Sequence, residues 1–82
     1  MILVNCSIAQ TDIIKLISEY KVDGEYIFRH LKTEGIKIYF NSTLNDDYKA
    51  CDIISNIIRG HKYGPIIFFN VVPVYKNEIK WF

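Results

Sequence analysis

The spacing of hydrophobic residues changes along this chain, and these changes constrain the fold more than any other feature. Residues 2–8 alternate between apolar and polar side chains, which is the pattern of a strand with one buried face. The next segment has helical spacing and predicts a helix over 10–22. Thr11 is a suitable N-cap for this helix, and Gly24 is positioned to end it. The chain is therefore expected to open with a strand followed by an amphipathic helix.

Two further strands and a second helix are expected to follow. Residues 25–32 and 36–42 predict strands joined by a short loop that contains glycine. A wide apolar band at helical spacing then covers 45–59, where Asn45 can cap the helix and Gly60 can stop it. Such a band predicts a helix that packs firmly on a sheet.

The last part of the chain is expected to add one strand and a tail. Residues 66–72 predict a strand that is apolar on nearly both faces, and Pro73, which has no N–H, marks a bulge or the end of its pairing. Residues 73–82 are expected to form a short β extension. The resulting β-α-β-β-α-β order is the split-βαβ or ferredoxin-like pattern, here in a single α+β domain spanning 1–82. This topology is a four-stranded antiparallel sheet with the first and third strands central and both helices on one face.

Composition fits a folded chain with a strand-rich core. Of the 82 residues, 15 are Ile and only two are Ala, which favours strands. The formal net charge of +1 is too small to attract a polyanion, so binding to nucleic acid would need a local basic patch. The N-terminal residues carry no basic segment, and the apolar stretch 66–74 is too short to span a bilayer. We therefore expect a cytoplasmic protein that does not bind membranes.

The reactive side chains form no catalytic or metal-binding motif. Cys6 and Cys51 are single thiols with no Cys-x-x-Cys pairing, and we expect both to be reduced and half-buried. His30 and His61 fall in a strand and in a loop, and the sequence contains no phosphate-binding loop or metal-ligand spacing. The sequence thus predicts a protein that is not an enzyme and holds no cofactor or metal.

The sheet face opposite the helices is the first candidate for binding. Alternation assigns one set of side chains to the helix side: Ile2, Val4, Cys6, Ile36, Ile38 and Phe40. It assigns the intervening set to the open side: Leu3, Asn5, Ser7, Lys37, Tyr39 and Asn41. A face that mixes aliphatic, aromatic, amide and cationic groups is typical of an interaction surface on a small protein. The alternative is that the C-terminal extension covers it.

The two edge strands extend this open face. Because burying an unpaired Arg is costly, Arg29 is expected to point outward, with Ile27 and Leu31 on the same side. The opposite parity, with Tyr26, Phe28 and His30 outside the core, competes with it and stays open. In the last strand, Asn70 is expected outward together with Ile66 and Phe68.

The chain terminus adds a further apolar feature. Trp81 and Phe82 are large aromatic residues at a position that would normally fray, so they are expected to pack on the domain or to anchor a partner. The first hypothesis is therefore a non-catalytic domain that associates with a second copy, as a homodimer, or with another protein. Its candidate contact residues are Arg29, Lys37, Tyr39, Phe68, Asn70, Trp81 and Phe82.

Two other classes of function remain open at this point. A nucleic-acid-binding module would use Arg29, Lys37 and Tyr39, the cations for phosphates and the ring for stacking. A small-ligand sensor would use polar side chains in the segment after the first strand, among them Ser7, Gln10 and Thr11, although such residues also cap helices.

Overall fold

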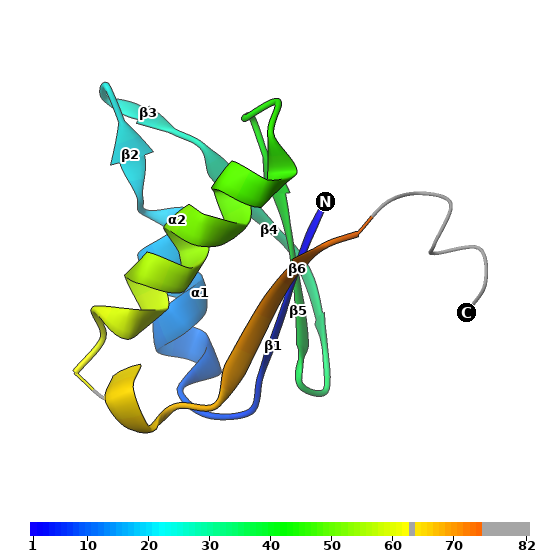
Figure 1. Cartoon of the computed structure of the whole chain (residues 1–82), viewed down its shortest axis with the longest axis vertical. Helices are drawn as coiled ribbons and strands as arrows, with labels where there is room; N and C mark the ends of the chain where they lie inside the picture. Colours follow the sequence, from blue (N-terminus) through cyan, green and yellow to red (C-terminus); the bar gives the residue numbers. More distant parts are fainter. Residues whose placement is uncertain (63, 75–82) are drawn as a thin grey trace.

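A computed structural model describes residues 1–62 and 64–74 of the chain (Figure 1). The elements in order are β1 (Ile2–Cys6), α1 (Gln10–Ser18), β2 (Lys21–Val22), β3 (Glu25–Tyr26), β4 (Phe28–Glu34), β5 (Lys37–Ser42), α2 (Asp47–Arg59), the 3-10 turn η1 (Gly64–Ile66) and β6 (Phe69–Pro73). The protein is thus a mixed α+β structure, as the sequence predicts.

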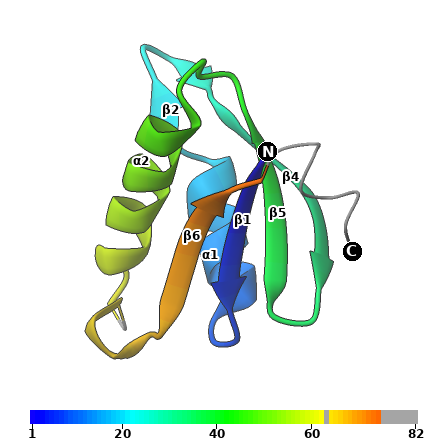
Figure 2. The ribbon, with the colours of Figure 1, turned by 45° about the vertical axis from the view of Figure 1, so that its right-hand side comes forward.

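The main sheet has four antiparallel strands in the order β4-β5-β1-β6, so β1 and β5 are central and β4 and β6 are the edges. Both helices lie on the same side of this sheet (Figure 2). Helix α1 packs near β4, and α2 packs near β6. Among residues 1–62 and 64–74, no helix covers the other face of the sheet (Figure 2).

The core lies between the sheet and the two helices. Its fully buried side chains come from β1, β5 and both helices: Ile2, Val4, Cys6, Ile13, Ile17, Ile38, Phe40, Ile54 and Ile58. Alternate residues of β1 and β5 therefore point toward the helices, as their spacing predicts. Burial of each such side chain contributes about 1.5–3 kcal/mol.

Helix α1 begins at the expected residue, but its first turn is not capped as expected and it ends earlier. It begins at Gln10, after Ala9 in a left-handed conformation with φ 55°, and no side chain caps it. The Gln10 amide instead donates 2.7 Å hydrogen bonds to the carbonyl oxygens of Cys6 and Gly35. Thr11 is therefore not the cap, and the helix ends at Ser18 rather than at 22.

A small hairpin, β2–β3, occupies the segment where the helix was expected to end. Asp23 and Gly24 form its turn with φ of 53° and 81°. Two consecutive positive φ values match the tight turns that join two-stranded ribbons, for which Asp-Gly is a preferred sequence. Gly24 thus shapes a hairpin and does not end a helix.

The expected strand 25–32 is divided and irregular. Ile27 is buried between β3 and β4, so its expected outward position is wrong. Phe28 is buried and Arg29 is exposed, which confirms the outward position of Arg29. The pairing with β5 shifts between His30 and Lys32, which leaves Leu31 as a β-bulge.

The second helix and the last strand also begin later than expected. Asp46, not Asn45, caps α2, because its carboxylate accepts from the N–H groups of Tyr48 at 2.9 Å and Lys49 at 3.2 Å. Ile66 lies in η1, and β6 begins only at Phe69. Pro73 is the last residue of β6, and one further backbone hydrogen bond follows it, from the Val74 N–H to the Met1 carbonyl at 2.8 Å.

The expected C-terminal extension lies outside the described residues beyond Val74, and so do Trp81 and Phe82. In the stretch that the structure describes, no helix combines the length and apolar character needed to cross a lipid bilayer.

Candidate interaction surface

The hydrogen-bond alternation of the sheet fixes which groups meet on the open face. The Cys6 N–H donates to the Ile36 carbonyl at 2.8 Å, and the Val74 N–H donates to the Met1 carbonyl at 2.8 Å. In antiparallel pairs, hydrogen-bonded and non-hydrogen-bonded positions alternate. The backbone groups of Leu3 and Asn5 therefore bond to β6. Those of the alternate residues, Val4 and Cys6, bond on the β5 side.

The open face consists of cross-strand rows. One row runs from Tyr39 through Leu3 to Val72, and the next runs from Lys37 through Asn5 to Asn70. On the β4 side these rows continue to Lys32 and Glu34, and Arg29 lies opposite Asn41. Thus Arg29, Lys37, Tyr39 and Asn70 share this face.

The half of the face formed by β4 and β5 carries charge. The Lys32 ammonium lies 3.0 Å from a Glu34 carboxylate oxygen and 4.9 Å from the centre of the Tyr39 ring. The hydrogen bond that Lys32 donates to Glu34 and the charge of that carboxylate raise the pKa of Lys32 above its ordinary value. Lys32 was not among the predicted contact residues, because only the bulge at Leu31 brings it to the open face.

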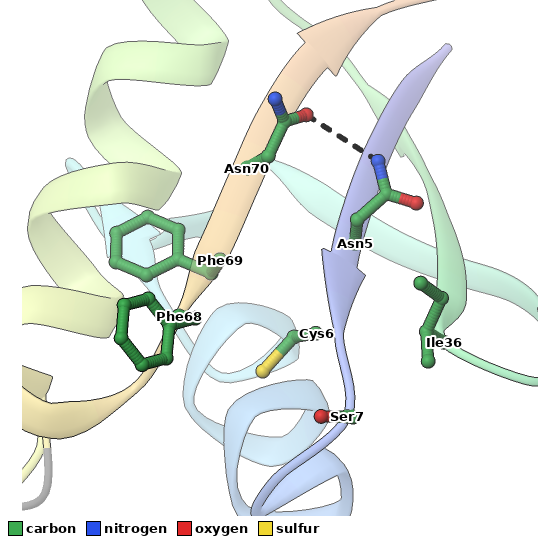
Figure 3. A pocket seen from close by; sticks show the side chains of 7 residues that line it. All are labelled: Asn5, Cys6, Ser7, Ile36, Phe68, Phe69 and Asn70. Carbon is green, nitrogen blue, oxygen red and sulfur yellow. Dashed lines mark hydrogen bonds between the residues drawn. The ribbon is translucent and has the colours of Figure 1, made fainter.

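The half of the face formed by β1 and β6 carries no charge. The Asn5 amide donates to the Asn70 side-chain oxygen at 3.3 Å (Figure 3). Strand β6 itself, from Phe69 to Pro73, contains no ionisable side chain. The two halves of the open face therefore differ in how readily water can be removed from them.

A shallow hollow of about 300 Å³ lies where β1 ends and β6 begins. Figure 3 shows its lining residues, which are Asn5, Cys6, Ser7, Ile36, Phe68, Phe69 and Asn70. The Phe68 side chain is 92% exposed, and Ile36 and Ile66 are 52% and 70% exposed. The expectation that Ile36 faces the core is wrong, because Gly35 turns the chain with φ 60° and β5 starts only at Lys37.

The thiols and histidines lie apart from this surface or contribute only packing. Cys6 and Cys51 are buried free thiols. Burial raises the pKa of Cys51, and the carboxylates of Asp47 and Asp52 raise it further. His61, in the segment after α2, lies 3.5 Å from an Asp12 carboxylate oxygen of α1. Among the described residues, no group of His, Cys, Asp and Glu side chains is arranged to hold a metal ion.

No protein-family model matches the chain, and comparisons with curated proteins and with solved structures gave no match. Function must therefore be inferred from the surface itself.

Proposed function

We propose that this chain is a non-catalytic association domain that forms a homodimer through β6 and the adjoining open sheet face. The observation that carries the proposal is Phe68, whose ring is 92% exposed immediately before an uncharged edge strand. The arrangement of β1 and β5 in the sheet centre, with both helices on one side, supports assigning the domain to the ferredoxin-like topology.

The energetics favour association at this end of the sheet. Removing a Phe side chain from water contributes about 1.5–3 kcal/mol, and a symmetric dimer gains this twice. Aromatic residues also commonly anchor interfaces. Because Arg29, Lys32 and Lys37 lie on the other half of the face, contact through the open face of β6 leaves these three groups hydrated. On the helix side of β6, the Arg59 guanidinium lies 5.9 Å from the centre of the Phe69 ring.

Replacement of Phe68 tests the proposal. We expect Phe68→Ala to weaken dimerisation by about a hundredfold or more, since about 1.5–3 kcal/mol of burial is lost in each of the two copies. Sedimentation velocity over a concentration series, with native mass spectrometry, measures the effect. The circular dichroism spectrum and melting temperature should be preserved, because Phe68 contributes little to the core.

Tyr26→Ala is the matched control, because Tyr26 is a 59% exposed aromatic residue on the β2–β3 hairpin, and this hairpin lies at the opposite end of the molecule from the start of β6 (Figure 1). A wild-type protein that stays monomeric across the series contradicts the proposal, as does a Phe68→Ala protein that dimerises like wild type. Trp81 and Phe82 remain predicted contacts, and Trp81→Ala in the same assay tests the tail.

A second candidate function is binding of single-stranded nucleic acid to the charged half of the face. It is favoured by the placement of Arg29, Lys32 and Lys37 beside Tyr39 on one surface. Cations can track phosphates while an aromatic ring stacks on a base. Against it, the Lys32 ammonium already occupies the space over the Tyr39 ring, 4.9 Å from its centre.

Fluorescence anisotropy with a labelled oligonucleotide at low salt tests this second candidate. Binding through phosphate contacts would weaken as salt rises, and Lys37→Ala would lower the salt slope by about one. A titration at low salt in which the anisotropy does not change would exclude nucleic-acid binding.

A small-ligand-sensing role has weaker support, because the Gln10 amide is already bound to the backbone of Cys6 and Gly35.

A further inference from the structure

The outer side of β6 presents unpaired backbone groups. The hydrogen bond from Val74 to Met1 sets the alternation, so Leu3 pairs with Val72 and Asn5 with Asn70 through the backbone. Phe69, Val71 and Pro73 consequently direct their backbone groups away from β1. Among the described residues, no strand pairs with this side of β6. Phe69 and Val71 each offer an N–H and a C=O there, whereas Pro73 offers only a C=O.

We propose that the homodimer forms by antiparallel pairing of β6 with β6 of a second copy, with Asn70 opposite Asn70 at the twofold axis. This inference rests on the proposed function and specifies its interface. In this register Phe69 lies opposite Val71 of the second copy, and Val71 opposite its Phe69. Every outward N–H and C=O of these two residues then has a partner.

The neighbouring registers satisfy fewer backbone groups. Centring the pair on Val71 sets Phe69 opposite Pro73, whose nitrogen has no hydrogen to give to the Phe69 carbonyl. Centring it on Phe69 sets Val71 opposite Ile67, whose N–H already donates to the Gly64 carbonyl at 3.2 Å. In the proposed register, Ile67 and Pro73 face each other at the end of the ladder, where neither has an N–H left to bond.

The side chains on the open face are self-complementary in the same register. Asn70 accepts from Asn5 at 3.3 Å, and its own amide nitrogen points away from Asn5 (Figure 3). That nitrogen is available to donate to the Asn70 oxygen of the second copy, and the reverse bond follows by symmetry.

Phe68 also gains a partner in this register. Phe68 immediately precedes β6. Extending the pairing by this one residue puts Phe68 on the face of Asn70 and Val72, opposite Val72 of the second copy. An aromatic residue across from a β-branched residue is a favourable cross-strand pair. The pairing therefore covers the ring that is 92% exposed in the single copy.

A single cysteine at the axis tests the register. Residues that face each other without exchanging hydrogen bonds have Cα atoms about 4.5 Å apart, within the range of a disulfide. We expect Asn70→Cys to form a covalent dimer under mild oxidation, seen as a band of twice the mass on a non-reducing gel. Asn41→Cys is the matched control, since Asn41 is an exposed Asn on the same face in a central strand, and it should remain largely monomeric on the gel.

Wild-type protein controls for the native thiols, both of which are buried. Hydrogen exchange gives a second readout without substitution: the N–H groups of Phe69 and Val71 should gain protection as protein concentration rises. A wild-type dimer in which Asn70→Cys fails to cross-link and these amides stay unprotected overturns the register while leaving the homodimer intact. A wild type that is monomeric at every concentration overturns both.

Discussion

The two edges of the main sheet differ in how they are protected. Strand β4 carries a bulge at Leu31 and the exposed charges of Arg29, Lys32 and Glu34. Strand β6 has regular pairing with β1 and no charged residue. Bulges and charged side chains are the usual means by which proteins prevent edge strands from pairing with other chains. The comparison therefore indicates that β4 is built to stay unpaired and that β6 is not.

Each protective feature of β4 has a physical basis. The bulge twists the strand, so its outward N–H and C=O groups no longer form a straight row. A partner strand would also have to displace water from the Lys32–Glu34 pair, whose side chains are 58% and 59% exposed. Within β6 itself the comparable obstacle is Pro73, which lies at the last position of the strand, and beside it the Arg59 guanidinium lies 5.9 Å from the centre of the Phe69 ring.

The most direct test of the difference between the two edge strands is a proline at position 71, in place of Val71. Its N–H points outward, so Val71→Pro removes a donor to the second copy and leaves the hydrogen bonds with β1 in place. We expect dimerisation to weaken by about a hundredfold, since a hydrogen bond is lost in each copy and the ring obstructs the approach. Sedimentation velocity measures the dissociation.

Val72→Pro is the neighbouring control, because the Val72 N–H bonds to Leu3 within the sheet. It should lower the free energy of unfolding of the single copy by about 1–3 kcal/mol, which urea denaturation measures. If Val71→Pro dimerises normally, or unfolds as readily as Val72→Pro, the outer edge of β6 does not have the role proposed for it.

A charge placed at the proposed twofold axis should weaken dimerisation less than the proline does. In Asn70→Lys, two ammonium groups face each other in the dimer, and we expect about tenfold weaker association at low salt. Screening should restore part of the affinity at high salt. Asn45→Lys, in the exposed segment before α2, adds the same charge away from the edge and should leave the dimer intact. Equal behaviour of the two variants would count against Asn70 at the axis.

The smallest expected effect is on the pH dependence of the free energy of unfolding, and it concerns Cys51. This thiol must stay unreactive if cross-linking is to report on β6 alone. Its pKa is raised in the folded protein by burial and by the carboxylates of Asp47 and Asp52. As pH rises past the pKa of the unfolded thiol, about 8.5, the unfolded chain loses this proton before the folded one does. The free energy of unfolding should therefore fall over that range.

Urea denaturation of wild type and Cys51→Ala at pH 7 and pH 9.5 checks this dependence. Cys51→Ala should lose less stability between the two pH values than wild type. An identical loss in both proteins would show that other groups account for the alkaline destabilisation.

The sequence predicts the layout of the sheet better than its irregular parts. The alternation in β1 and β5, and the cost of burying an unpaired Arg, place Asn5, Tyr39 and Arg29 on the open face, where the structure has them. The hairpin at Asp23–Gly24 has a recognisable turn sequence, but Gly24 also suits the end of a helix. Local sequence alone does not decide between these two roles.

Other features depend on pairing between distant segments. The bulge at Leu31 exists because β4 must pair with β5 on both sides of it, and no residue type marks that position. Without the bulge, Lys32 cannot be assigned to the open face. Ala9 likewise adopts a left-handed conformation with φ 55°, a state that its residue type does not favour. The exposure of Phe68 was predicted, although for a strand residue rather than one just before β6.

The bulge in β4 also bears on the size that an assembly of this chain can reach. A β-sheet can grow into a fibre only if every added copy leaves a new edge open to the next. When two copies join through β6, both remaining edges of the combined sheet are β4 strands, each kinked at Leu31 and lined with charge. In the proposed dimer, growth of the sheet would then stop after a single addition. Leu31, the one residue of β4 left out of its pairing with β5, would in that arrangement limit the assembly of this isoleucine-rich chain to two copies.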